Sequence, residues 1–249
     1  MNIVVCVKHV PDTEARVQIA ADGKSIETQE INFILNPFDE FAVEQALLTR
    51  EKLGGEVSVV SLGGDSAAAA IRTAMAMGAD KGILLKTSQP ADDPLQIARA
   101  IAAEIGGMNA NVVFFGKQAV GNEHGQVGLL VAELLGLAGI SEVSEIEITE
   151  NGATGRREIE GGTESFQCSL PAVFTAQKGL NEPRYPSLKG RMAAKKKPLE
   201  VKQISLGEQL LAVQSLNYPP QRERGKIVGE GAAAAGELVR LLREEAKVI

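Results

Sequence analysis

The fold is decided by residues 56–86, whose sequence is EVSVVSLGGDSAAAAIRTAMAMGADKGILLK. Residues 56–62 include four aliphatic side chains and predict a buried strand. A turn at 63–66 leads into a run of small residues, 67–77, that favours a helix, and residues 82–86 predict a second strand. This order of strand, helix and strand is typical of a parallel sheet that is covered by helices.

The same alternation extends on both sides of this unit. Asn36-Pro37 predicts a sharp helix start, because asparagine can cap a helix and proline is tolerated at its first position. Within residues 16–28, Asp22-Gly23 lies between two short alternating runs and predicts a hairpin. We expect an α/β fold with a Rossmann-like parallel sheet and helices on both faces. The further segments are strands at 3–7 and 111–115 and helices at 36–53, from 93 to about 102 and from about 126 to 135.

The pattern changes in the second half of the chain. Residues 142–148 and 154–159 predict antiparallel strands around a turn, and residues 172–176 predict one more apolar strand. Residues 178–228 are rich in proline and charge and are too long for an ordinary loop. We expect an arm here that lies on another surface.

The last segment, 232–247, predicts a helix with Leu238, Leu241 and Leu242 on one face. A helix that follows a non-globular arm needs a partner surface to bury such a face. We therefore expect an α/β domain at 1–205 and a C-terminal arm and helix at 206–249.

The composition excludes several classes of protein. The 249 residues carry a formal net charge of -6, so the basic surface of a general nucleic-acid binder is missing. Two cysteines cannot form a zinc site or a disulfide framework. The first residues predict a buried strand rather than a signal peptide, and no run of about 18 apolar residues is present. We expect a cytoplasmic protein with no targeting segment and no membrane insertion.

Candidate binding residues gather where the predicted strands end, because ligands of open α/β sheets bind at the carboxyl ends of the strands. Four segments meet there: 6–12, 36–39, 62–66 and 116–128. The last has small residues that let the backbone approach a ligand, and a helix start that suits a phosphate. The alternative is that its glycines only shape a turn from strand to helix, and spacing alone favours neither reading.

A catalytic or metal site is hard to assemble. His9 and His124 have no obvious nucleophile or acidic cluster beside them, and we interpret both as polar loop residues near a ligand. Asp92-Asp93 before a proline predicts a helix cap. The run 195–197 of three lysines could meet nucleic acid or an acidic partner, but a solvated face is the favoured interpretation in an acidic protein.

Several segments together resemble the beta subunit of electron transfer flavoproteins. They occur in the family's order between residue 1 and about residue 200, and Phe166 and Phe174 are mild departures from its signature region. The segments are Val7 to Asp12, Leu35 to Glu44, Ile71 to Asp80, Gly116 to Ala119, Gly125 to Gly128, Arg157 to Glu164, Leu170 to Val173, Leu180 to Leu188 and Lys195 to Lys197.

The resemblance implies a heterodimer with a larger alpha subunit that holds most of a redox-active FAD. It implies an adenine-nucleotide-binding fold that holds a second nucleotide, usually AMP. The residues that would line its adenosine side are Cys6, Asn36, Pro37, Phe38 and Leu62. The residues that would hold its phosphate are Gly121, Asn122, Gly125, Gln126, Val127 and Gly128.

The resemblance also implies contacts with partners. Phe38 and Thr13 lie where the family approaches the flavin of the alpha subunit. A recognition loop at about 180–195 would dock on client dehydrogenases, with Leu188 as its apolar anchor. The tail from about Gly207 would embrace the alpha subunit. The residues expected to dock are Tyr185, Leu188 and Met192.

The implied function is that of an electron carrier rather than an enzyme. Such a subunit accepts electrons from flavin dehydrogenases such as the acyl-CoA dehydrogenases of fatty acid oxidation, and passes them toward a membrane quinone reductase of the ETF-quinone oxidoreductase type. One branch of the family holds a second FAD in place of AMP and accepts hydride from NADH in electron bifurcation. The loop 121–125 departs from that branch's pattern and from the acidic loop of mitochondrial-type members, and we favour AMP. An alternative of another class is a stand-alone adenine-nucleotide-binding module.

Overall fold

The computed structural model describes residues 1–221 and 224–249. The described residues form two compact units, Met1–Ser215 and Leu216–Ile249. Residues 206–215, at the start of the expected arm, belong to the first unit.

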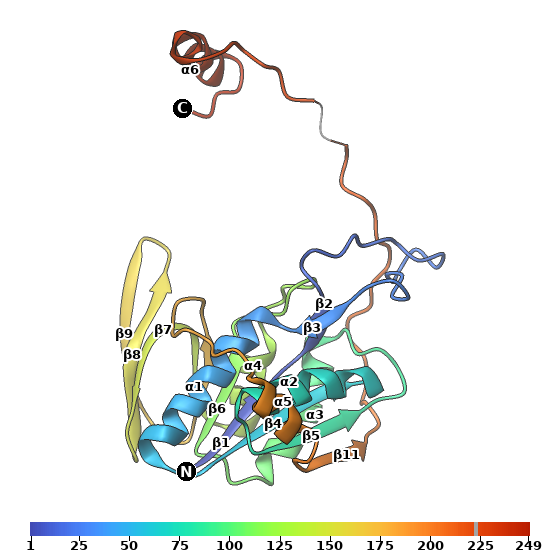
Figure 1. The fold of residues 1–249 in the computed structure, drawn as a ribbon, viewed down its shortest axis with the longest axis vertical. Helices are drawn as coiled ribbons and strands as arrows, with labels where there is room; N and C mark the ends of the chain where they lie inside the picture. The colour runs from blue at the N-terminus through green and yellow to red at the C-terminus, as the bar shows by residue number, and fades with distance from the viewer. Residues whose placement is uncertain (222–223) are drawn as a thin grey trace. The chain divides into compact units, whose positions relative to one another are not determined.

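The first unit is built on one large sheet (Figure 1). Within the described residues, nine strands form it in the order β11-β5-β4-β1-β6-β10-β7-β8-β9. Every pairing from β11 to β7 is parallel, and only β8 and β9 join the described sheet by antiparallel pairing. The strands are β1 (Asn2–Cys6), β4 (Glu56–Gly63), β5 (Lys81–Lys86), β6 (Val112–Gly116), β7 (Ala138–Ile148), β8 (Gly152–Ile159), β9 (Gly162–Ser169), β10 (Ala172–Ala176) and β11 (Leu199–Gln203).

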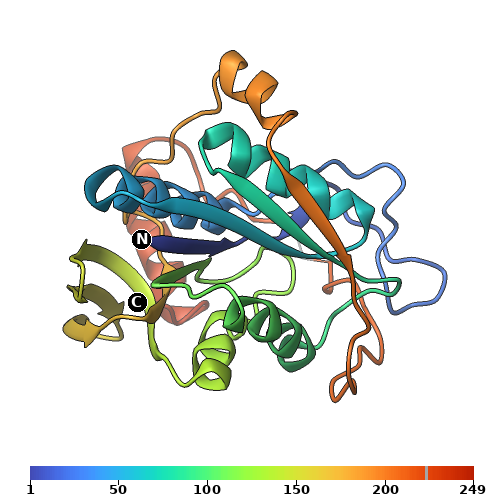
Figure 2. The ribbon, with the colours of Figure 1, turned by 90° about the horizontal axis from the view of Figure 1, so that it is seen from below.

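Helices cover both faces of this sheet, which confirms the predicted α/β class (Figure 2). The helices α1 and α2 lie on one side, where they pack with Ile3 and Val57. The helices α3 and α4 lie on the other side, where they pack with Val4 and Val113. Consecutive residues of β1 thus enter different cores, as expected for a strand that is buried on both faces. The helices of this unit are α1 (Pro37–Leu53), α2 (Ala68–Met77), α3 (Pro94–Gly106), α4 (Val127–Leu135) and α5 (Leu188–Ala194).

The strand β10 lies between β6 and β7, although it follows β9 in the chain. All of its residues are buried, whereas most residues of β9 are exposed. Burial stabilises an apolar strand most where both of its faces are covered. A strand of polar residues is stable at the edge of a sheet, where its side chains stay in contact with water. The chain therefore runs out to the edge of the sheet through β7, β8 and β9 and then returns to the interior of the sheet as β10.

Two local expectations need correction. Part of the predicted arm belongs to the sheet, because β11 pairs in parallel with β5 and α5 precedes it. The predicted hairpin at 16–28 is reduced to an isolated bridge between Ile19 and Ile26, at a turn where Asp22 accepts hydrogen bonds from the backbone of Lys24 and Ser25. The nearby antiparallel pair is instead β2 (His9–Pro11) with β3 (Phe33–Leu35).

The second unit contains a 3-10 turn, Ala232–Ala234, followed by the helix α6 (Ala235–Glu244). The helix is strongly amphipathic. Leu241 is buried, whereas Leu238 and Val239 are exposed. On the polar side, Arg240 forms ion pairs with Glu237 at 2.6 Å and with Glu244 at 2.7 Å.

No helix among residues 1–221 and 224–249 combines the length and the hydropathy needed to cross a membrane.

Candidate nucleotide-binding site

The buried carboxylate of Asp39 joins two strand ends. Asp39 lies in the first turn of α1, where its Oδ2 accepts the backbone N–H of Lys8 at 2.7 Å. Its Oδ1 accepts the backbone N–H of Gly116 at 3.1 Å. The carboxyl ends of β1 and β6 are therefore held against the start of α1, which brings three of the four predicted segments together.

Gly116 is required for this approach. A Cβ at residue 116 would lie 2.4 Å from Oδ1 of Asp39 and 2.7 Å from the carbonyl carbon of Phe38. Burial raises the pKa of Asp39 to about 7, while the hydrogen bonds from Lys8, Asn36 and Gly116 act in the opposite direction. The sequence alone does not indicate these bonds of Asp39, although the glycine at the end of β6 is a signal of a close contact.

Asn36 links the start of α1 to the loop after β6. Its side chain is fully buried, its Nδ2 donates to the carbonyl oxygen of Gln118 at 2.8 Å, and its Oδ1 accepts the N–H of Val120 at 3.2 Å. The predicted capping role is wrong, because the side-chain oxygen of Asn36 accepts no hydrogen bond from a backbone N–H of the first turn of α1. Pro37 does occupy the start of the helix, as predicted.

The adenosine-side residues expected from the resemblance lie at the edges of this cluster. Cys6 is buried at the end of β1, and burial, followed by the charge of Asp39, raises the pKa of its thiol. Leu62 is half-buried near the end of β4. Phe38 is half-buried, and the ammonium of Lys117 lies 5.7 Å from the centroid of its ring.

The loop between β6 and α4 is exposed at the expected phosphate-side residues. Gly121 and Gly125 have φ angles of 104° and 60°, in the region that favours glycine. The ammonium of Lys8 donates to Oδ1 of Asn122 at 2.9 Å, so a positive charge from the segment between β1 and β2 lies beside this loop. Partial burial lowers the pKa of Lys8, and the carboxylates of Asp39 and Asp92 oppose that shift. The exposed residues are Gly121, Asn122, Gly125 and Gln126.

The helix α4 begins at Val127 and is seated directly on the sheet. A Cβ at Gly128 would lie 2.8 Å from Cγ2 of Thr175 and 3.2 Å from the ring of Phe115, so a glycine allows this contact. The first N–H groups of a helix have no acceptor within the helix, and its amino end carries a partial positive charge. The loop and the start of α4 therefore offer donors and positive charge that fit a phosphate.

The two histidines lie in different environments. His9 belongs to β2, and its ring centroid is 5.3 Å from that of Phe33. Burial lowers the pKa of His9. His124 is exposed in the loop before α4. Throughout the described part of the chain, no three His, Cys, Asp or Glu side chains are grouped closely enough to hold a metal ion.

The segment expected to dock on dehydrogenases exposes its apolar side chains. Tyr185 is 96% exposed, Leu188 is 79% exposed and Met192 is 57% exposed. Thr13, the residue expected near the partner flavin, is exposed in the segment between β2 and β3.

The amino side of the docking segment is fixed to α1. The guanidinium of Arg184 donates to both carboxylate oxygens of the buried Glu44, at 2.8 Å from Nε to Oε2 and 2.8 Å from Nη2 to Oε1. It also pairs with Glu51 at 2.7 Å. The side chain of Asn181 donates to the carbonyl oxygen of Phe41 at 3.0 Å.

The carboxyl side is fixed to α2. Nζ of Lys197 donates to the carbonyl oxygens of Met75 and Gly78 at 3.0 and 3.3 Å, at the carboxyl end of α2. A Cβ at Gly190 would lie 2.4 Å from the carbonyl oxygen of Ala76, so α5 contacts α2 closely. The predicted solvated face of the lysine run thus holds for its first two members, which are exposed, but not for Lys197.

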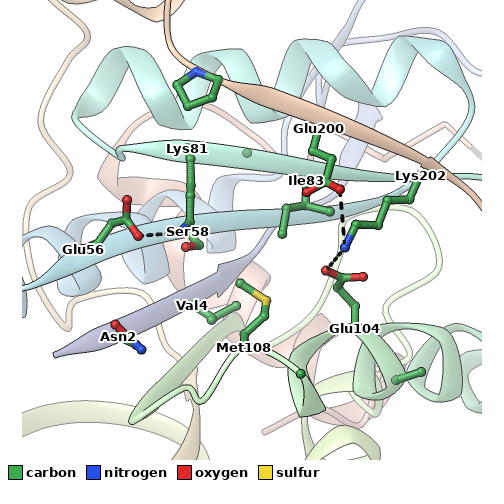
Figure 3. A pocket seen from close by; sticks show the side chains of 14 residues that line it. Asn2, Val4, Glu56, Ser58, Lys81, Ile83, Glu104, Met108, Glu200 and Lys202 are labelled. Carbon is green, nitrogen blue, oxygen red and sulfur yellow. Dashed lines mark hydrogen bonds and ion pairs between the residues drawn. The ribbon is translucent and has the colours of Figure 1, made fainter.

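A hollow of about 510 Å³ lies elsewhere, beside the amino ends of β1, β4, β5 and β11 (Figure 3). Its charged side chains pair with one another: Lys202 lies 2.7 Å from Glu104, and Lys81 pairs with Glu56. Ligands of open α/β sheets bind at the opposite ends of the strands. The candidate site is therefore the cluster around Asn36 and not this hollow.

The sequence matches one protein family and many relatives. The sequence model of the electron transfer flavoprotein domain matches residues 24–206. The electron transfer flavoprotein subunit beta of Bacillus subtilis (strain 168) is 40% identical, with 100% of both chains covered. The subunit of the same name from Syntrophomonas wolfei subsp. wolfei is 41% identical, with 100% of this chain and 98% of that protein covered. The Homo sapiens subunit of that name is 38% identical, with 90% of this chain and 91% of that protein covered.

Proposed function

The chain belongs to the electron transfer flavoprotein family, as a beta subunit, and on this premise we propose that it pairs with a larger alpha subunit, completes the site of that subunit's FAD and binds an AMP of its own. The chain's role is in electron transfer. The flavin supplies the redox chemistry when it is bound. A carrier of this kind needs its residues for binding and positioning rather than for acid–base catalysis.

The nucleotide proposal is supported most directly by the contacts of Asn36 with the loop after β6, which lie beside the start of α4. The phosphate of AMP would be held by the N–H groups at Val127 and Gly128, with the positive charge of Lys8 close by. The adenosine would lie against Cys6 and Leu62 and the segment from Asn36 to Phe38. Both polar atoms of the Asn36 side chain are already bonded to residues 118 and 120. Asn36 would therefore shape the site and would not donate its side-chain amide to the nucleotide.

The glycines of the site fit a group of this kind. Gly121 and Gly125 adopt φ angles at which a side chain would be strained, and both lie in the exposed loop that precedes the helix. Loops of this shape expose backbone N–H groups to an anion. On the other side of the site, Thr13 and Phe38 would approach the flavin of the alpha subunit.

The proposed electron donors are flavin dehydrogenases such as acyl-CoA dehydrogenases, and the proposed acceptor is a membrane quinone reductase. Docking would use Tyr185, Leu188 and Met192, whose exposure supports this role. Their segment is fixed at Arg184 on one side and at Lys197 on the other. A fixed loop loses little conformational entropy when it docks. The amphipathic α6 and the arm before it would bind the alpha subunit.

The identity of the released nucleotides tests this proposal. The chain should be purified together with its alpha subunit, and the nucleotides should be released by denaturation and quantified by chromatography. We expect one FAD and one AMP per heterodimer. Two FAD and no AMP would overturn the AMP assignment in favour of a bifurcating subunit that accepts hydride from NADH. A chain that stays monomeric and folded through residue 249 and binds no alpha subunit would indicate a stand-alone module.

A further inference from the structure

Asp93 caps α3, as the sequence predicts. Its Oδ1 accepts the backbone N–H groups of Leu95 at 2.9 Å and of Gln96 at 3.4 Å. The residue is buried, whereas its neighbour Asp92 is exposed. The cap uses one of the two carboxylate oxygens and leaves the other available to a second partner.

That second oxygen holds the start of the C-terminal arm. Oδ2 of Asp93 accepts the backbone N–H of Leu210 at 2.6 Å and that of Leu211 at 3.1 Å. One helical turn away, the side chain of Gln96 donates to the carbonyl oxygen of Gly207 at 2.5 Å. Three hydrogen bonds therefore join residues 207–211 to the first turn of α3. We name these contacts the arm clasp.

The arm clasp acts on the backbone and not on the side chains of the arm. Leu210 is 63% exposed and Leu211 is 46% exposed, so burial of these side chains contributes little to holding the segment. The hydrogen bond from Leu210 is the largest contribution to a lowered pKa of Asp93, so the carboxylate is in its charged, acceptor-only form at neutral pH. A charged acceptor with two N–H donors makes the stronger kind of hydrogen bond.

We propose that Asp93 is a positioning residue for partner binding, because it holds the start of the arm, residues 207–211, against α3. This inference rests on the proposed function, in which the arm and α6 bind the alpha subunit. Just before the clasp, Ile204 donates its N–H to the carbonyl oxygen of Lys86. Loss of the clasp would release residues 207–211 from α3, so more of their order would have to form on binding, and ordering free residues weakens association.

Asp93→Asn separates the cap from the clasp. Asparagine caps helices about as well as aspartate, so its one acceptor oxygen can serve α3. Its amide group is a donor and cannot accept from Leu210 or Leu211. Asp92→Asn is the matched control, since it makes the same change of charge one residue away at an exposed position. Gln96→Ala is a second variant that removes only the bond to Gly207.

Two measurements are made on each variant. Hydrogen–deuterium exchange of the 207–211 amides in the isolated full chain reports the clasp, and titration with the alpha subunit reports the dissociation constant. For Asp93→Asn we expect exchange at least about tenfold faster, a dissociation constant raised about tenfold and a melting temperature close to that of the wild type. Gln96→Ala should change both quantities in the same direction by a smaller factor, and Asp92→Asn should change neither.

Three outcomes would overturn the inference and leave the proposed function standing. Unchanged exchange in Asp93→Asn would show that the clasp does not hold the arm. Faster exchange with an unchanged dissociation constant would show that the clasp has no role in partner binding. Should Asp93→Asn fail to fold, wild-type values in Gln96→Ala would refute the clasp. If the wild-type chain binds no alpha subunit, the proposed function fails and this inference fails with it. The exchange data distinguish that case, because the amides of residues 207–211 would still be protected in the wild-type chain.

Discussion

The side-chain amide of Asn36 donates to the carbonyl oxygen of Gln118 at 2.8 Å, so a partly buried hydrogen bond connects residues that lie far apart in the sequence. Asn36→Ala removes this bond and the one from Val120. A buried polar group that loses its partner costs about 1–3 kcal/mol. We expect AMP affinity, measured by calorimetry on nucleotide-stripped heterodimer, to fall by about tenfold or more. Asn32→Ala, at an exposed position, should leave the affinity unchanged, and equal affinities for both variants would contradict this role of Asn36.

The raised pKa of Asp39 predicts a loss of stability as pH rises. In the unfolded chain this carboxyl loses its proton near pH 4, whereas in the folded chain it keeps the proton until about pH 7. The folded state therefore binds more protons across this window, and the free energy of unfolding decreases with pH by up to about 1.4 kcal/mol per unit. The contribution is fully present below pH 4 and lost above pH 7.

Asp39→Asn tests this dependence through urea unfolding at pH 5, 6 and 7. The variant should show a smaller decrease in unfolding free energy over this range than the wild type. Glu150→Gln, in an exposed turn, should keep the wild-type decrease. The same pH dependence in Asp39→Asn and in the wild type would show that Asp39 does not titrate in this window.

Leu188 is expected to be the apolar anchor for client dehydrogenases. Burying a leucine side chain on docking is worth about 1.5–3 kcal/mol. Leu188→Ala should therefore lower kcat/KM for electron transfer from an acyl-CoA dehydrogenase by about tenfold or more, with flavin content unchanged. Leu134→Ala removes an exposed leucine from α4 and serves as the control. Equal transfer rates in the two variants would contradict the docking role.

Arg184 is expected to keep the docking segment in one conformation. Lysine retains the charge but cannot donate to both oxygens of Glu44 in the planar geometry of a guanidinium. Arg184→Lys should make the bonds after residues 185–189 more sensitive to limited proteolysis and should raise KM for the dehydrogenase more than it lowers kcat. Arg191→Lys, an exposed arginine in the same segment, is the control. Unaltered proteolysis of Arg184→Lys would contradict the proposed fixation.

The helix α6 is expected to bind the alpha subunit through its apolar side. Deletion of residues 230–249 removes Leu238, Val239 and Leu241 but leaves the first compact unit intact. The heterodimer should then dissociate at concentrations where the full-length complex stays associated, as measured by analytical ultracentrifugation. The melting temperature of the isolated chain should stay the same. A truncated complex as stable as the full-length one would refute this role of α6.

Local patterns in the sequence predict most of the first unit. The strands β1, β4, β5 and β6 are apolar because both faces are covered, and Pro37 and Gly54 mark the ends of α1. The strand β11 was not predicted, since three of its five residues are exposed and an edge strand has no apolar alternation. The short helix α5 was missed because Gly190 lies inside it and lowers its helix propensity.

The sequence indicated which segments meet at the candidate site, but not which hydrogen bonds join them. Cys6, Asn36 and the loop at 121–128 were placed at strand ends from the sequence, and the structure puts Asn36 at the centre of the cluster. The partners of Asn36 could not be predicted, because they come from a distant loop. The second partner of Asp93 was missed for the same reason, since a cap explains the residue without reference to the arm.

The position of β10 has a consequence for the order of events during synthesis. Ala172 pairs with both Val112 of β6 and Ala138 of β7, so this five-residue strand joins the first half of the sheet to the second. Until residue 176 has left the ribosome, β6 and β7 each present an unpaired edge, the kind of edge at which chains associate wrongly. Contacts between residues so distant in sequence also form slowly. The arrival of one short strand therefore sets the earliest moment at which the nascent sheet can close.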